Sequence, residues 1–124
     1  GARGRGAAPA AAAATAVVSR RALGPFVFST TWAYIDHVVV TPGASMPEQA
    51  HDVVGEAYYV LAGAGTVTIK GATPQTAAVR TGDAVPIRIG ETSQFANTGS
   101  EPLELFVMGV ARDMAAKTRL LSGN

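Results

Sequence analysis

Apolar positions cluster in short runs rich in Val, Thr, Ile and aromatic residues from residue 32 onward. Groups of Gly, Pro, Asn and Asp, each suited to a tight turn, separate these runs. The pattern predicts strands over residues 32–40, 57–61, 65–69, 75–79, 84–89, 93–97 and 103–110. Residues 113–121 have apolar positions at helical spacing, which predicts a short C-terminal helix. Short strands at regular spacing are typical of a β-sandwich or a small barrel.

The first 21 residues differ in composition from the remainder. They are rich in Ala and Gly and carry Arg3, Arg5, Arg20 and Arg21 with no acid, which leaves six basic and nine acidic residues in the rest of the chain. Four dispersed arginines make a weak electrostatic footprint, so we expect a solvated arm and no nucleic-acid partner. We divide the chain into this arm, residues 1–21, and one folded domain, residues 22–124.

Composition limits the chemistry. A chain of 124 residues can form one domain with a core around a small pocket. The absence of cysteine excludes disulfides, thiolate zinc sites and a cysteine nucleophile, and the only histidines are His37 and His51. No run approaches the roughly 20 apolar residues that span a bilayer. We therefore expect a soluble, cytoplasmic protein with no membrane partner.

Two segments carry motifs that resemble the paired motifs of the cupin superfamily. The first runs from Pro42-Gly43 to Gly63 and contains Gln49, His51 and Glu56; the second runs from Gly82 to Asn97 and contains Gly90 and Ser93. The resemblance covers residues 38 to about 113. It implies an all-β fold, the cupin double-stranded β-helix, a jelly-roll-like barrel, here with an extended N-terminal arm and a short C-terminal helix.

The resemblance also implies a metal site with four ligand positions, and this chain has the family's residue type at two of them. Gln49 and Ser93 stand where the family has its first and last ligand histidines, whereas His51 and Glu56 match the family pattern. Neither a carboxamide nor a neutral hydroxyl rivals imidazole as a ligand for divalent transition metals. We therefore expect no cofactor. The alternative is a divalent metal ion (Fe, Mn, Zn or Ni) bound by His51, Glu56 and Gln49.

His37 could change this expectation. Strand alternation places it on one face with Ile35 and Val39, and places Tyr34, Asp36 and Val38 on the other. The sequence does not indicate which face looks inward. An inward His37 would add a metal ligand, a substrate contact or a second acid/base group, and an outward His37 would be a surface or interface residue.

The same alternation assembles a candidate pocket. If Glu56 points into the barrel, Tyr58 and Val60 do so too, while Tyr59 and Leu61 lie outside. The phase of Ser93 likewise brings Phe95 inward. We therefore predict an apolar cup with His51, Glu56 and Tyr58 as catalytic residues. Gln49, Ser93, Phe95 and His37 are the predicted substrate-binding residues.

A histidine beside a glutamate in such a cup is a plausible acid/base pair, with His51 as base and Glu56 as orienting carboxylate or acid. Tyr58, Gln49 and Ser93 could donate hydrogen bonds to a developing enolate oxygen. This favours a cupin isomerase, dehydratase or cyclase acting on a small oxygenated molecule. The alternatives are a metal-dependent cupin oxygenase or isomerase with a reduced ligand set, and a non-catalytic small-molecule-binding cupin. We also expect a homodimer, because the segment over residues 17–28 can add a strand to a sheet edge.

Overall fold

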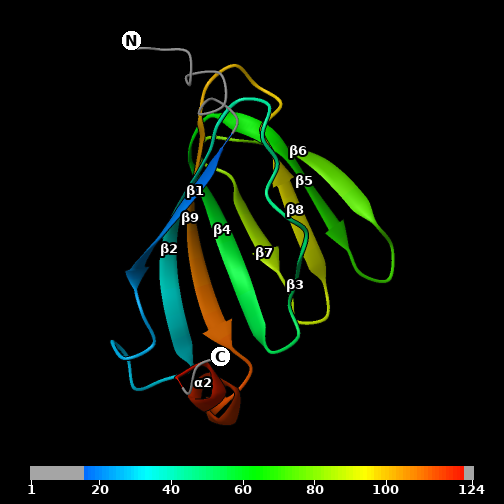
Figure 1. The fold of residues 1–124 in the computed structure, drawn as a ribbon. Helices are drawn as coiled ribbons and strands as arrows, with labels where there is room; N and C mark the ends of the chain where they lie inside the picture. Colours follow the sequence, from blue (N-terminus) through cyan, green and yellow to red (C-terminus); the bar gives the residue numbers. More distant parts are fainter. Residues whose placement is uncertain (1–15, 122–124) are drawn as a thin grey trace.

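Two antiparallel sheets face each other in the computed structural model, which describes residues 16–121 (Figure 1). The first sheet has the strand order β1-β2-β9-β4-β7, and the second has the order β3-β8-β5-β6. The elements are β1 (Val17–Leu23), β2 (Trp32–Val40), β3 (Gln49–Ala50), β4 (Val54–Ala62), β5 (Ala64–Lys70), β6 (Gln75–Arg80), β7 (Ala84–Ile87), β8 (Thr92–Ala96), β9 (Leu103–Ala111) and α2 (Met114–Leu121). The all-β prediction with a C-terminal helix is confirmed.

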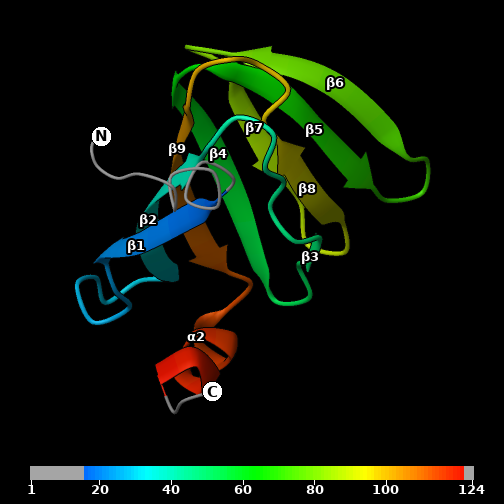
Figure 2. The ribbon, with the colours of Figure 1, turned by 45° about the horizontal axis from the view of Figure 1, so that its top comes forward.

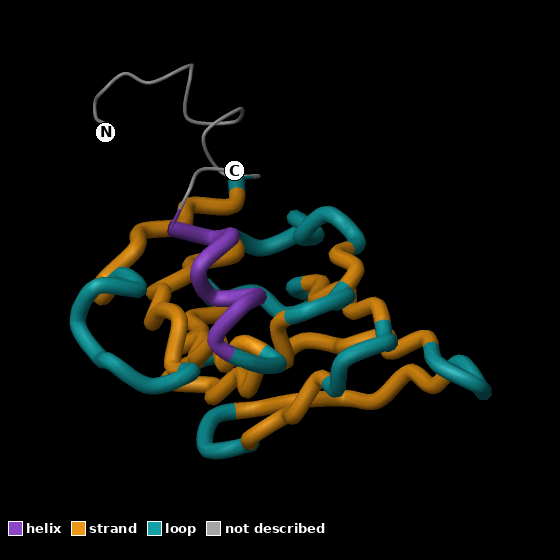
Figure 3. The backbone as a smooth tube through the Cα atoms, turned by 90° about the horizontal axis from the view of Figure 1, so that it is seen from below, coloured by secondary structure: helices purple, strands orange, loops and turns teal. Residues whose placement is uncertain are grey.

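The core lies between the two sheets because the longer strands turn alternate apolar side chains inward. On β4, Tyr58 and Val60 are 1% and 0% exposed, whereas Tyr59 and Leu61 are about 40% exposed, as the alternation predicts. The helix α2 lies across one end of the barrel (Figure 3). Among residues 16–121, no helix is long and apolar enough to cross a membrane.

The strand β1 crosses the predicted boundary between arm and domain at residue 21. It is an edge strand that pairs with β2 of the same chain, with Val17 opposite Val40 and Arg21 opposite Asp36 (Figure 2). The last residues of the predicted arm therefore belong to the first sheet. The remainder of that arm, residues 1–15, lies outside the described residues, and the homodimer stays a prediction.

Other element bounds differ from the predicted ones for local reasons. The strand β4 begins at Val54, three residues before the predicted start at residue 57. The prediction began late because Gly55 and Glu56 interrupt the apolar pattern that marks a strand. The strand β7 ends at Ile87, where Arg88 accepts a hydrogen bond from the Glu91 amide and forms a turn. The two-residue strand β3 is too short and too exposed to have a sequence signal.

Asn97 joins the end of β2 to the loop that follows β8. Its side-chain amide donates to the carbonyl oxygens of Val40 and Glu101, both at 2.8 Å, and its side-chain oxygen accepts from the Gly99 amide at 2.9 Å. The residue is 3% exposed. The last residue of the second cupin-like motif is therefore a structural junction in this chain.

Replacing this side chain is expected to destabilise the fold. The Asn97→Ala variant loses three hydrogen bonds, one of them the buried bond to the Val40 carbonyl, so the free energy of unfolding should fall by about 3 kcal/mol. Urea denaturation of both proteins measures the difference. A loss below about 0.5 kcal/mol, the range typical of ordinary surface substitutions, would show that the junction contributes little.

Candidate functional site

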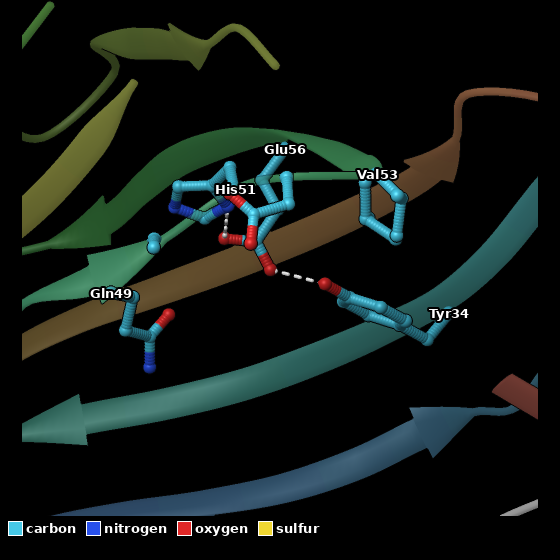
Figure 4. Close-up of a pocket in the computed structure, with 8 residues that line it drawn as sticks. Tyr34, Gln49, His51, Val53 and Glu56 are labelled. Atoms are coloured by element: carbon cyan, nitrogen blue, oxygen red, sulfur yellow. Dashed lines mark hydrogen bonds and ion pairs between the residues drawn. The ribbon is translucent and has the colours of Figure 1, made fainter. Parts of the chain in front are cut away.

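Glu56 is the centre of a buried polar cluster inside the barrel. The alternation of β4 turns it inward, and its side chain is 7% exposed. Its Oε2 accepts a hydrogen bond from the Tyr34 hydroxyl at 2.5 Å, and its Oε1 accepts one from the Tyr58 hydroxyl at 2.7 Å. The Nδ1 of His51 lies 3.6 Å from the same Oε1 (Figure 4). The carboxylate thus faces two phenols and one imidazole.

Tyr34 reaches Glu56 across an intervening strand, because β9 lies between β2 and β4. Gly109 of β9 is the register partner of both Tyr34 and Glu56. A Cβ atom at Gly109 would lie 2.3 Å from the Cζ of Tyr34 and within 2.6 Å of two further ring atoms. The glycine is therefore required for the phenol ring to lie flat over the sheet and place its hydroxyl on Glu56.

His51 is held from both sides. Its backbone amide donates to the Glu91 carbonyl at 3.1 Å, and its carbonyl accepts from the Gly90 amide at 2.7 Å. Its Nε2 lies 3.0 Å from the Ser93 Oγ, and its Nδ1 faces Glu56. Both His51 and Ser93 are buried, at 5% and 2% exposure. Both ring nitrogens therefore face protein atoms, which suits a group that positions the carboxylate.

The two phenols of the cluster stay protonated. Burial raises the pKa of Tyr34 well above its ordinary value of 10.0, and the hydrogen bond to Glu56 adds to this effect. Burial also raises the pKa of Tyr58, with further contributions from the charge of Glu56 and the hydrogen bond to it, while Ser93 acts in the opposite direction. Both hydroxyls are therefore hydrogen-bond donors at every ordinary pH.

A spectroscopic titration tests this protonation state. The chain has three tyrosines, and we expect the tyrosinate absorbance of folded protein to report at most one of them up to about pH 11. Above about pH 10 the unfolded state releases the protons that folded Tyr34 and Tyr58 retain, so stability should fall as pH rises through this range. Two or three tyrosines ionising together while the circular dichroism spectrum stays folded would contradict the assignment.

Two adjoining cavities open next to Glu56. The first, of about 470 Å³ and called here the Glu56 pocket, is lined about equally by polar and apolar surface. Its lining residues are Tyr34, Gln49, Ala50, His51, Asp52, Val53, Val54 and Glu56. The second, of about 290 Å³ and called the inner chamber, shares Gln49 and Glu56 with the first and is lined mostly by apolar surface. A small organic molecule could occupy either cavity.

The structure brings most of the sequence-predicted site residues together. His51, Glu56, Tyr58 and Ser93 form the cluster, and Gln49, which faces Ser93 in the β3–β8 register, lines both cavities. Phe95 packs against Tyr58 with ring centroids 4.4 Å apart, so it supports the phenol from the core. The catalytic and binding roles of these residues stay predictions.

His37 does not join the cluster. It lies on the opposite face of β2 from Tyr34, and its Nε2 is 2.5 Å from the Oε2 of Glu104 on β9. The two side chains are 27% and 38% exposed. The inward alternative for His37 is thus wrong, because the inner face of β2 is the one that carries Tyr34, Asp36 and Val38.

The sequence did not reveal the residues of β1 and β2 that contact Glu56 or its partner Tyr34. Tyr34 bonds Glu56, and the guanidinium of Arg21 lies 4.2 Å over the centroid of the Tyr34 ring. Arg21 also donates two hydrogen bonds to the carboxylate of Asp36. An isolated glycine within a strand, as at Gly109, is a signal of close backbone approach that could have pointed to this side of the site.

The donor set fits a divalent metal poorly. Each oxygen of Glu56 already accepts a phenol hydrogen bond, and the Nε2 of His51 is engaged by Ser93. Gln49 adds only an amide, and within the described part of the chain no three His, Cys, Asp or Glu side chains lie together as a metal site would require. The ligand set of His51, Glu56 and Gln49 would have to break these bonds before it could bind an ion.

Comparisons with known proteins agree on one fold. The family model described as Cupin domain matches residues 36–109. A predicted oxalate decarboxylase from Thermotoga maritima is 23% identical with a TM-score of 0.70, over 77% of this chain and 80% of that one. A Cupin 2 conserved barrel domain protein from Salinispora arenicola is 19% identical with a TM-score of 0.67, over 89% and 87%. A recombinant oxalate oxidase in complex with glycolate is 19% identical with a TM-score of 0.68, over 80% and 53%. No curated protein matches the sequence.

Proposed function

The chain belongs to the cupin family, and we propose that it is an enzyme that transfers a proton within a small oxygenated molecule bound next to Glu56. Reactions of this class are isomerisation, dehydration and cyclisation. The observation that carries the proposal is the buried Glu56 carboxylate with a protonated phenol on each oxygen. Burying this many polar groups inside the barrel is costly, and a stability role alone gives no reason for it.

The proposed step begins with a substrate carbonyl next to Tyr34 and Tyr58. Each phenol can turn its O–H from Glu56 to the carbonyl oxygen, which frees a carboxylate oxygen to act as base. Glu56 takes a proton from the adjacent carbon, the C–H electron pair forms the enolate C=C bond, and the phenols stabilise the enolate oxygen. In a β,γ-unsaturated ketone, return of the proton to the γ-carbon re-forms the carbonyl and completes an isomerisation. In a β-hydroxy ketone, the β-hydroxyl leaves with this proton as water, the carbonyl re-forms, and a dehydration is complete.

In this proposal Glu56 and His51 exchange the roles that the sequence suggested. Glu56 is the base because it lines both cavities, whereas His51 lines only the Glu56 pocket and both of its ring nitrogens face Ser93 or Glu56. The imidazole then fixes the position of the carboxylate, with its Nδ1 3.6 Å from the Glu56 Oε1. The names of the oxalate-related neighbours indicate small oxygenated acids, but at these identities they support the fold alone, and the proposal rests on the cluster.

The experiment that tests the proposal is isotope exchange in deuterated water. Neutral ketones are incubated with the protein near neutral pH, and loss of their α-protons is followed by proton NMR. We expect exchange well above the rate in buffer. Ligands that bind the protein without any exchange across the panel would contradict catalysis and favour a non-catalytic binding protein.

The two neighbouring tyrosines of β4 provide a matched pair. Tyr58→Phe removes a donor to the enolate oxygen, so the exchange rate should fall by about 100-fold. Tyr59→Phe makes the same chemical change on the outer face, where the side chain is 41% exposed, and the rate should stay unchanged. Equal rates in the two variants would remove Tyr58 from the mechanism.

A further inference from the structure

The inner chamber differs from the Glu56 pocket in its walls and in its charge. Three of the apolar residues that line the inner chamber, Val38, Met46 and Val107, also belong to the hydrophobic core. The outermost wall is β1, which contributes Val17 and Ser19 and pairs with β2 alone. The chamber is thus a mostly apolar space that begins at Glu56 and ends under a single edge strand.

The second carboxylate of the inner chamber is neutralised. Asp36 lies in its wall, and Arg21, the next inward residue of β1 after Ser19, forms an ion pair with it. Arg21 also covers the ring of Tyr34. The strand β1 is fixed at its other end, where the Thr41 Oγ1 donates to the Ala16 carbonyl at 3.0 Å. The strand β1 is therefore anchored at both ends. Because Asp36 is already paired, an uncharged group fits the chamber better than an ion.

We propose that the inner chamber binds an apolar arm of the substrate, about the size of a phenyl ring or a short branched alkyl group. The reacting carbonyl then lies at Glu56, between the two cavities, and the Glu56 pocket takes the polar remainder of the molecule. This inference rests on the proposed function. It sets the substrate class as neutral carbonyl compounds with an apolar substituent, as distinct from two-carbon acids, which would leave the chamber empty.

Two ethyl ketones test this assignment. Butanone and propiophenone carry the same exchangeable CH₂ group, and propiophenone has a phenyl ring where butanone has a methyl group. Burial of the additional ring in the chamber should make propiophenone bind at least about tenfold more tightly, as measured by saturation-transfer NMR. Equal binding of the two ketones, or no binding of propiophenone up to its solubility, would overturn the assignment.

Two substitutions on β1 locate the bound arm. Ser19→Phe fills the chamber from an exposed edge strand and should weaken propiophenone binding by about tenfold or more, with little change for butanone. Val18→Phe places the same ring on the opposite face of the strand, where the residue is 59% exposed, and should leave both affinities unchanged. Circular dichroism checks that both variants fold, and the wild-type comparison of the two ketones stands without them.

The binding and exchange measurements separate two possible failures. If propiophenone binds in the chamber but its CH₂ protons do not exchange, the chamber assignment holds and the proposed proton transfer is wrong. If both ketones exchange and bind with equal affinity, proton transfer holds and the chamber assignment is wrong. An unchanged affinity of folded Ser19→Phe for propiophenone also counts against the chamber.

Discussion

The Glu56→Gln variant is expected to lose about 1,000-fold in the rate of ketone α-proton exchange while keeping its fold. The amide has the shape of the carboxylate but cannot take up a proton from carbon. Its oxygen can still accept one phenol hydrogen bond, so Tyr34 or Tyr58 keeps a partner. Exchange is measured by proton NMR, and folding by circular dichroism and thermal unfolding.

The matched control is Glu104→Gln on the outer face of the same sheet. Glu104 contacts His37 and does not line the Glu56 pocket or the inner chamber, so its variant should exchange protons at the wild-type rate. Glu56→Asp is informative as well, because it keeps the charge but shortens the reach to both phenols. A Glu56→Gln rate within threefold of wild type, a margin of about 0.7 kcal/mol in the barrier, would exclude this carboxylate as the base.

The Gly109→Ala variant should disturb the site without changing any polar group. The new Cβ would lie only 2.3 to 2.6 Å from three atoms of the Tyr34 ring, so the ring must move off the sheet and its hydroxyl must leave Glu56. We expect the free energy of unfolding to fall by about 2 kcal/mol, as for other overpacked cores. We also expect about a 100-fold loss of exchange, the cost of one lost donor to an oxyanion.

Two further variants assign this effect to Tyr34. Gly55→Ala adds a methyl group to the neighbouring strand, where the nearest atom, the Ile87 carbonyl oxygen, is 3.4 Å away, and it should be tolerated. In Tyr34→Ala the clash partner is absent, so adding Gly109→Ala to it should cost little further stability. Fully additive losses of stability in the double variant would show that the glycine does not act through the phenol ring.

The sequence predicted the fold from short strands and two cupin-like motifs, and it predicted the β4 side of the site from strand alternation. Alternation on β4 and β8 placed Glu56, Tyr58, Ser93 and Phe95 inside, and the structure places them there. Two motifs at the right separation placed His51 beside them. The inward residues of β4 and β8 needed only the period of a strand, whereas the cupin fold and the place of His51 came from the resemblance to the cupin motifs.

The β2 side of the site was beyond this reasoning. Residues 35–40 are apolar or ionisable on both faces, so alternation alone could not decide whether His37 or Tyr34 looks inward. The answer depends on the strand order, which brings β9 between β2 and β4 and makes Gly109 the neighbour of both Tyr34 and Glu56. Contacts between strands far apart in the sequence carry no local signal.

The central claim is that the protein's own carboxylate moves the proton. The most direct test measures the α-proton exchange rate of one ketone with protein treated with chelator, with elemental analysis of the same sample, before and after addition of Fe, Mn, Zn or Ni. We expect the metal-depleted protein to keep its full rate and the added metals to leave it unchanged. A rate that disappears with the metal and returns with one of these ions would contradict the account.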